Sequence, residues 1–195
     1  MRFWRRGRES GGDPPADAPF PEFAYHAGPR STGVVVESDA RCRACGIARG
    51  YIYTGPVYAA DELDDALCPW CIADGSAAKK FDAEFTDAGV GVPDDVPGEI
   101  VETIARRTPG FSAWQEERWL YHCGDGAVFL GAVGRDELEE YPEALDALRQ
   151  ERVESGRPAD EVEEYIAALE TDGDATAYLF RCRHCGRHLA YSDFA

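Results

Sequence analysis

Three pairs of cysteines, each separated by two residues, constrain the fold of this chain more than any other feature. The chain has seven cysteines: Cys42 with Cys45, Cys68 with Cys71, Cys182 with Cys185, and Cys123 alone. Its first residues lack the apolar run of a secretory signal, so we expect a cytoplasmic protein with reduced thiols. In that setting the pairs are interpreted as metal ligands and not as disulfides.

The first two pairs have the spacing of a zinc finger. Two residues between cysteines let a tight turn direct both sulfurs to one ion, and Gly46 after the first pair relieves the bend. The 22 residues between Cys45 and Cys68 suit a β-hairpin, and the second pair lies where a helix is expected to begin. We therefore expect Cys42, Cys45, Cys68 and Cys71 to bind one Zn²⁺ in a treble-clef-like finger.

The second pair also fits a different chemistry. Cys68-Pro-Trp-Cys71 has the form of a redox-active dithiol of the thioredoxin type. A redox site needs only one pair, whereas this pair has a companion at finger spacing. We therefore favour the zinc interpretation.

The third pair, Cys182 and Cys185, has the spacing of the first pair and is expected to form the same kind of tight turn, called a zinc knuckle. It needs two more ligands to bind a metal ion. Cys123 is the remaining thiol. The candidates for the fourth ligand are His122, Asp125, His184 and His188. His122 and Cys123 are adjacent and would face opposite ways in a regular strand, so only a turn lets both bind. We predict a second zinc at Cys123, Cys182, Cys185 and His122. The alternative is a metal-free knuckle with Cys123 as a small apolar residue.

Hydrophobic periodicity predicts an α+β fold. We expect strands at 33–37, 50–54, most of 117–133, 175–181 and 188–191, and helices at 72–81, 97–107 and, as two acidic amphipathic helices, within 136–170. The aromatic side chains expected in the core are Trp114, Trp119, Tyr121 and Phe129. The predicted organisation is a disordered tail (1–18), a zinc-finger-like unit (19–89) and a mixed second unit ending in the knuckle (90–195), which can also form one domain with the finger.

The charge of the chain limits its partners. Its formal net charge is −17, and residues 136–174 alone carry 15 Asp or Glu against 3 Arg. A phosphate backbone needs a basic protein face, so nucleic-acid binding is not expected. The charge is interpreted mainly as a solvated surface, and it also permits a basic protein partner. No membrane span is expected, because no stretch of about 18 apolar residues occurs.

Several segments together resemble the CbrC family of bacterial proteins. They are residues 53–58, 67–76, 80–87, 107–111, 114–119, 122–125, 129–131 and 180–194, with Cys-Pro-Trp-Cys-Ile-Ala-Asp-Gly (68–75) as the most specific motif. The resemblance implies a cytoplasmic bacterial protein with a cysteine-bound metal. The family is associated with tolerance of a nuclease-type colicin, and the resemblance implies no defined biochemical activity.

Two functions therefore remain open. The preferred one is a non-catalytic, zinc-stabilised interaction protein in a stress or toxin-tolerance response. The other is a metal-dependent hydrolytic enzyme that uses the second cysteine region, with His122, Asp125 or Glu116 near the metal. A closed four-ligand shell at each metal favours the first, and an open coordination position favours the second.

Overall fold

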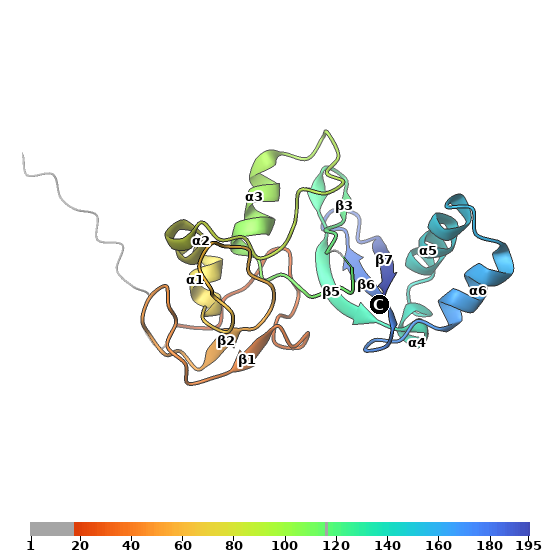
Figure 1. Cartoon of the computed structure of the whole chain (residues 1–195). Coiled ribbons are helices and arrows are strands. Elements are labelled where there is room, and N and C mark those ends of the chain that lie inside the picture. The colour runs from red at the N-terminus through yellow and green to blue at the C-terminus, as the bar shows by residue number, and fades with distance from the viewer. Residues whose placement is uncertain (1–17, 116) are drawn as a thin grey trace, which may run out of the picture.

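This computed structural model describes residues 18–115 and 117–195, which form short helices and small antiparallel sheets (Figure 1). The elements in chain order are β1 (Val35–Glu37), β2 (Tyr51–Tyr53), α1 (Pro69–Ala73), α2 (Ser76–Phe81), α3 (Gly98–Arg107), β3 (Tyr121–His122), β4 (Asp125–Gly126), β5 (Val128–Val133), α4 (Arg135–Leu138), α5 (Pro142–Glu154), α6 (Ala159–Ala167), β6 (Ala175–Arg181) and β7 (His188–Phe194). The predicted tail, apart from Ala18, and Glu116 lie outside the described residues.

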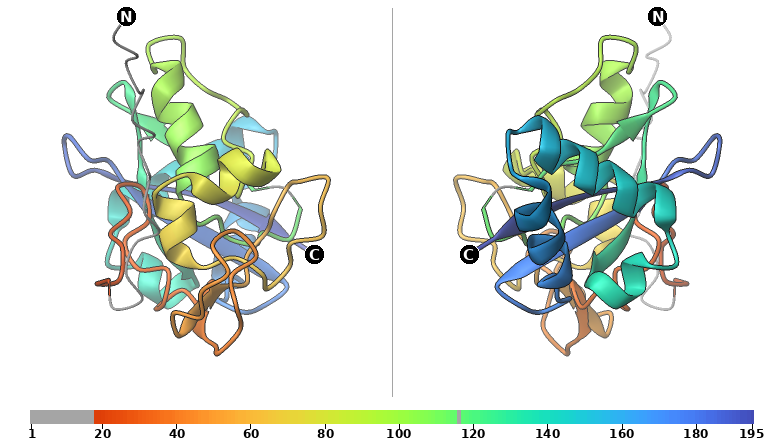
Figure 2. Two further views of the ribbon diagram at one scale, coloured as in Figure 1. Left: turned by 90° about the vertical axis from the view of Figure 1, so that its left-hand side faces the viewer. Right: turned by 90° about the vertical axis from the view of Figure 1, so that its right-hand side faces the viewer.

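A three-stranded antiparallel sheet, in the order β5-β6-β7, joins the two halves of the molecule (Figures 1 and 2). Side chains alternate across it: Ala177 and Leu179 of β6 face one layer, and Tyr178 and Phe180 face the other. In β5 a register shift between Phe129 and Gly131 interrupts this alternation. The sheet therefore has two buried faces, and each needs a covering layer.

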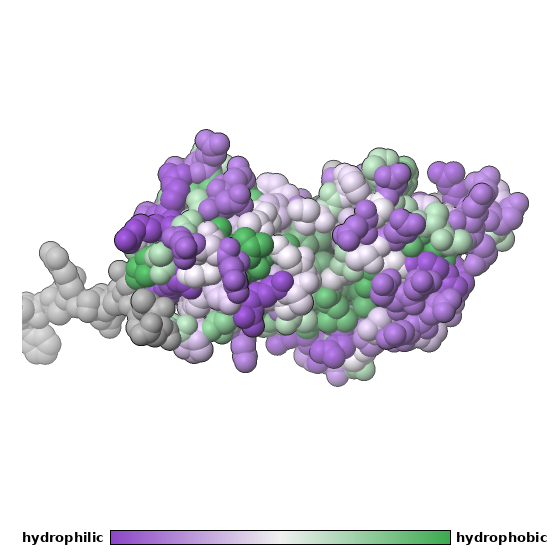
Figure 3. Space-filling view, turned by 90° about the horizontal axis from the view of Figure 1, so that it is seen from below, coloured by the Kyte–Doolittle hydropathy of each residue, from purple (hydrophilic) through white to green (hydrophobic). Residues whose placement is uncertain are grey.

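Helices α4, α5 and α6 cover one face of the sheet. The predicted apolar stripe is confirmed, because Leu145, Leu148, Val162, Ile166 and Leu169 are all buried. The segment forms three helices and not two, because the chain turns after α4 and Pro142 begins α5 at the first helical position. Hydrophilic residues gather on the outer surface at this end of the molecule (Figure 3).

An aromatic core covers the other face. It contains Phe111, Trp119, Phe129 and Phe180, with Phe111 stacked on Phe129 at a centroid distance of 4.1 Å. The core positions expected for Trp119 and Phe129 are confirmed, and Tyr121 packs at the edge. The expectation for Trp114 is wrong: its side chain is 50% exposed, and its Nε1 donates to the Gly173 carbonyl at 3.0 Å.

A second, smaller layer carries the first two cysteine pairs. Strands β1 and β2 pair antiparallel, and α1 and α2 pack beside them around their own apolar core (Figure 1). The single helix expected over 72–81 is broken at Gly75, which has φ +77° and separates α1 from α2. The strand expected over most of 117–133 is present in three parts, β3, β4 and β5, because the turn at Cys123 and Gly124 reverses the chain.

The aromatic core draws Tyr25 from the predicted finger unit and Phe180 from the predicted second unit. The division of the chain into units at residue 89 stays a prediction. No helix within residues 18–115 and 117–195 is both long and apolar enough to cross a membrane.

Candidate metal centres

The first cysteine group consists of Cys42 and Cys45, in the loop between β1 and β2, and Cys68 and Cys71, at the start of α1. Its four Sγ atoms all lie within 4.8 Å of one another. Zinc–sulfur bonds of about 2.3 Å place the sulfurs of a tetrahedral site about 3.8 Å apart. The group is therefore compact enough to surround one metal ion.

A tight turn aims the first pair. The Gly46 amide donates to the Cys42 carbonyl at 2.7 Å, and the Cys42 amide donates to the Ile47 carbonyl at 3.1 Å. Gly46 has φ +75°, a conformation that glycine adopts without strain. The Ala44 amide lies 3.4 Å from Cys42 Sγ, so it can donate to a thiolate there.

The second pair reaches the same point from α1. Cys68 precedes the helix, Pro69 begins it, and Cys71 lies in its first turn. The Cys68 amide donates to Cys42 Sγ at 3.3 Å, which links the two pairs directly. From α2, Lys80 Nζ donates to the carbonyl of Arg43 at 2.8 Å and so ties the turn to the helical layer.

The first cysteine group is closed to solvent. Cys42, Cys68 and Cys71 are buried and Cys45 is half-buried. The Trp70 ring, between the second pair, is 8% exposed, packs on Phe20 at a centroid distance of 5.7 Å, and donates from Nε1 to the Pro19 carbonyl. This burial is typical of a structural site and not of one that exchanges ligands.

Within this group hydrogen bonds between the thiols shift their pKa values in opposite directions. Hydrogen bonds from Cys68 and then Cys71 hold the pKa of Cys42 well below its usual range. The hydrogen bond to Cys42 in turn raises the pKa of Cys68 to about 12. A bound cation would deprotonate all four thiols, so its affinity falls as the pH falls.

The second cysteine group consists of His122, Cys123, Cys182 and Cys185, whose ligand atoms also lie within 4.8 Å of one another. His122 and Cys123 belong to the β3-β4 hairpin, where His122 pairs with Asp125. Cys123 and Gly124 form its two-residue loop with φ of +56° and +70°, as in a type I′ turn. This turn brings two adjacent side chains to one side, which a regular strand cannot do.

Cys182 and Cys185 come from the turn between β6 and β7. The Gly186 amide donates to the Cys182 carbonyl at 3.2 Å, and the His184 amide lies 3.4 Å from Cys182 Sγ. The turn has the same form as that at Cys42–Gly46. Nδ1 of His122 lies 3.1 Å from Cys123 Sγ and 3.5 Å from Cys185 Sγ, so this nitrogen is the one that faces the three sulfurs.

The second group is more open than the first. Cys123 and Cys185 are exposed, His122 is half-buried, and only Cys182 is buried. Burial works against ionisation of Cys182, but hydrogen bonds from the Cys185 amide, His122 and the His184 amide outweigh it and lower its pKa to about 6. Desolvation and the neighbouring thiols raise the pKa of Cys123 to about 11.

The other candidate ligands have different partners. Asp125 is 4% exposed and accepts from Tyr25 Oη at 2.9 Å and from Arg183 at 2.8 Å, with His184 Nε2 at 3.0 Å. His188 lies 3.2 Å from Glu143. These residues lie outside the second group, and Glu116 is not among the described residues.

The network around Asp125 was not foreseen from the sequence. It joins the hairpin that carries Cys123 to the turn that carries Cys182, because Arg183 and His184 lie between the two cysteines of the third pair. The position of Asp125, two residues after Cys123, was the one sequence signal for this network. Its hydrogen-bond partner Tyr25 lies 100 residues away in the sequence, so that contact could not be predicted. Such outer partners orient metal ligands.

His26 is a core residue and not a ligand. It is 1% exposed, its ring packs edge-on against Phe129, and Thr32 Oγ1 lies 3.3 Å from Nε2. Burial lowers its pKa to about 4, so the ring is neutral at physiological pH.

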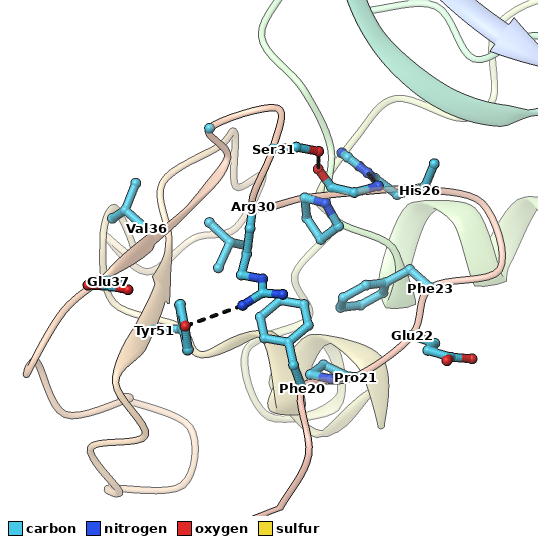
Figure 4. A pocket seen from close by; sticks show the side chains of 15 residues that line it. Phe20, Pro21, Glu22, Phe23, His26, Arg30, Ser31, Val36, Glu37 and Tyr51 are labelled. Carbon is cyan, nitrogen blue, oxygen red and sulfur yellow. Dashed lines mark hydrogen bonds between the residues drawn. The ribbon is translucent and has the colours of Figure 1, made fainter.

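A cavity beside β1 and β2 has a volume of about 1060 Å³, and none of its lining residues is a cysteine (Figure 4). Arg30 crosses it, lying 4.7 Å from the Phe20 ring centroid and donating to Tyr51 Oη at 3.3 Å. None of its lining residues belongs to either cysteine group.

Comparison with known proteins identifies the family to which the chain belongs. A model of the uncharacterised protein family UPF0167 matches residues 20–194. UPF0167 proteins of Mycobacterium bovis and Mycobacterium tuberculosis are each 57% identical over 176 residues, 90% of this chain and 94% of the relative. One from Pseudomonas aeruginosa is 40% identical over 177 residues, 90% of this chain and 98% of the relative. No solved structure matches. The chain therefore belongs to the UPF0167 family.

Proposed function

We propose that the protein binds two zinc ions, one in each cysteine group, and that both ions are structural. The observation that carries this proposal is the convergence of two complete four-ligand sets, four sulfurs in one and three sulfurs with a nitrogen in the other. Thiolate and imidazole ligands in a tetrahedron select zinc over magnesium, calcium or manganese. The treble-clef-like interpretation of the first group belongs to the same proposal.

The role that fits such sites is a non-catalytic one. A tetrahedral zinc with four protein ligands has no position left for water or substrate. We infer an interaction protein of the cytoplasm, in which zinc holds the hairpins in place. The resemblance to the CbrC family supports a role in stress or toxin tolerance, and the net charge of −17 supports a basic protein partner over nucleic acid.

A hydrolytic function would require the second group to release a ligand. His122 is the member that could be replaced by water, but its Nδ1 already faces the three sulfurs. Asp125, the nearest carboxylate considered as a base, is buried and engaged by Tyr25 and Arg183. No observation in the described residues favours this alternative.

The proposal is tested by metal content and coordination. We expect two zinc ions per chain, falling to one in Cys182→Ser, and X-ray absorption spectra that fit a mixture of four-sulfur and three-sulfur, one-nitrogen shells. His122→Ala should lose the nitrogen ligand. His188→Ala is the matched control, because His188 pairs with Glu143 and belongs to neither cysteine group, and it should keep both ions. One zinc or none in the wild-type protein refutes the proposal, and an oxygen ligand at the second ion favours the hydrolytic alternative.

A further inference from the structure

The two cysteine groups differ in how far solvent reaches their sulfurs. Of the seven cysteines, all of which lie within the described residues, only Cys123 and Cys185 are exposed. Both belong to the second group, and their Sγ atoms lie within 4.8 Å of each other. Cys123 comes from the β3-β4 turn and Cys185 from the turn between β6 and β7. The sulfurs of a disulfide lie about 2.0 Å apart, so these two need to approach by less than about 3 Å to form one.

The third sulfur of the group is shielded from solvent. Cys182 is 2% exposed, the His184 amide lies 3.4 Å from its Sγ, and the same Sγ lies 3.8 Å from the His122 carbonyl oxygen. These contacts hold it on the inner side of the group. The oxidation of cysteines follows the exposure of their thiolates. An oxidant in solution therefore meets Cys123 and Cys185 first.

A contact that does not involve metal holds the two exposed cysteines near each other. The Asp125 carboxylate, two residues after Cys123, accepts from Arg183, two residues before Cys185, at 2.8 Å. The Tyr25 hydroxyl donates to the same carboxylate from the core side at 2.9 Å. Asp125 is 4% exposed, and a buried hydrogen bond to a charged group is stronger than an exposed one. The two turns are therefore expected to stay together when a metal ion leaves.

The first group has the same thiol chemistry but lacks this access. Cys42, Cys68 and Cys71 are each at most 1% exposed, and only Cys45 is half-buried. No two sulfurs of the first group are therefore open to solvent together. The first group serves as an internal control for any effect that depends on access.

We propose that the second group is a site of oxidation by hydroperoxides, at which Cys123 and Cys185 form a disulfide and the bound zinc is released. One exposed thiolate attacks the peroxide, the O–O bond breaks, and the sulfur becomes a sulfenic acid as hydroxide leaves. The other thiolate attacks this sulfur, the S–S bond forms, and the S–O bond breaks as a second hydroxide leaves. The two sulfurs lose two electrons, the peroxide gains them, and both hydroxides take protons from solvent to become water.

The disulfide removes two of the four ligands of the second zinc ion. Cys182 and His122 remain, and two ligands are too few for a structural zinc site. The proposal rests on the proposed function only for the zinc that is released, because formation of the disulfide depends on the two sulfurs alone. A thiol reductant reverses the reaction by thiol–disulfide exchange.

The test is treatment of the zinc-containing full chain with hydrogen peroxide, followed by measurement of released zinc, free thiols and disulfide linkage. We expect the loss of one of two zinc ions and a fall from seven free thiols to five. Trypsin cleaves after Arg183 and so places Cys182 and Cys185 in different peptides. The expected product joins the peptide 119–135, which contains Cys123, to the peptide 184–187. Dithiothreitol with added zinc should restore the thiols and the second ion.

Two variants separate the disulfide from the release of zinc. Cys182→Ser is expected to lack the second ion but keeps both exposed cysteines, so it should still form the disulfide and release no zinc. Cys123→Ser should form no disulfide between the two turns and should leave Cys185 as a sulfenic acid, which dimedone traps.

Three results would overturn the proposal. They are a linkage that includes Cys182, release of both zinc ions at equal rates, and disulfides between two copies of the chain, which a non-reducing gel detects. Wild-type protein that contains fewer than two zinc ions but still forms the disulfide between Cys123 and Cys185 contradicts only the proposed function. Protein with two zinc ions that keeps all seven thiols in peroxide contradicts only the oxidation site.

Discussion

Replacing Cys123 by glycine should change stability in opposite directions with and without metal at the second cysteine group. Cys123 has φ +56°, a conformation that costs a residue with a Cβ atom about 1–2 kcal/mol. Glycine avoids this strain but loses about 0.5–1 kcal/mol more than other residues on folding. Without bound metal, Cys123→Gly is therefore expected to stabilise the protein by up to about 1.5 kcal/mol.

With zinc bound, the sign reverses. At a free zinc concentration about 100 times the dissociation constant, binding contributes about 2.7 kcal/mol to the unfolding free energy. Cys123 is one of three sulfurs in this group, so its loss removes that contribution. The relief of strain offsets only part of it. The net effect in zinc-containing protein is a destabilisation of about 2 kcal/mol.

The assay is urea unfolding in zinc-containing buffer, in the wild-type background and in Cys182→Ser, where the second ion is expected to be absent. Cys123→Gly should destabilise the first and stabilise the second. Cys185→Gly is the matched control: Cys185 is also exposed but is not among the residues with positive φ, so glycine there should destabilise in both backgrounds. If Cys123→Gly destabilises both backgrounds equally, the turn is not strained and the group holds no metal; if it stabilises both equally, the turn is strained but the group holds no metal.

Three further predictions concern the rest of the molecule. A chelator should remove zinc in two phases, with the faster phase from the more exposed second group, and zinc release from Cys182→Ser should show the slow phase alone. The pKa of His26 is lowered to about 4, so the folded state favours the neutral ring; the stability from this residue is complete above pH 6.5 and falls by up to about 3 kcal/mol as the pH approaches 4. His26→Gln should reduce that loss in unfolding curves at pH 7 and 5 with zinc content controlled, and an unchanged pH profile would contradict it. Leu148→Ala, at a core residue 1% exposed, should lower the unfolding free energy by about 2–5 kcal/mol, whereas Val153→Ala, at a position 52% exposed, should change it by less than about 0.5 kcal/mol.

Much of the local structure could be predicted from the sequence, because it depends on residues close together in the chain. The spacing of Leu145 and Leu148 predicts a buried helix face, and the structure buries both. The expected strand at 175–181 matches β6. The two cysteine pairs of the first group also depend on local structure. A tight turn that Gly46 permits holds the first pair, and the beginning of α1 holds the second.

Where the structure differs from the prediction, the cause is a backbone conformation or a distant contact that the hydrophobic periodicity of the sequence does not reveal. A helix continuing from Cys71 to Phe81 satisfies the apolar pattern, but Gly75 adopts φ +77° and divides it. Trp114 was expected in the core on its hydrophobicity alone. In the structure its indole packs at the surface and donates to Gly173, a contact between segments 59 residues apart.

The sequence by itself determined that the chain carries cysteine knuckles, a buried β6 strand and acidic amphipathic helices, since spacing and periodicity act over a few residues. The sequence predicted His122 as the fourth member of the second cysteine group beside Asp125, His184 and His188 as other candidates, and only the tertiary structure decided between them. His122 and Cys123 are adjacent, and their side chains lie on the same side only because the turn at Cys123 takes a positive φ. The β6-β7 turn then places Cys182 beside them. Asp125 was another candidate ligand, but its buried carboxylate accepts hydrogen bonds from Tyr25 and Arg183 instead. A buried carboxylate takes the partners that packing brings to it, and those partners lie far away in the sequence.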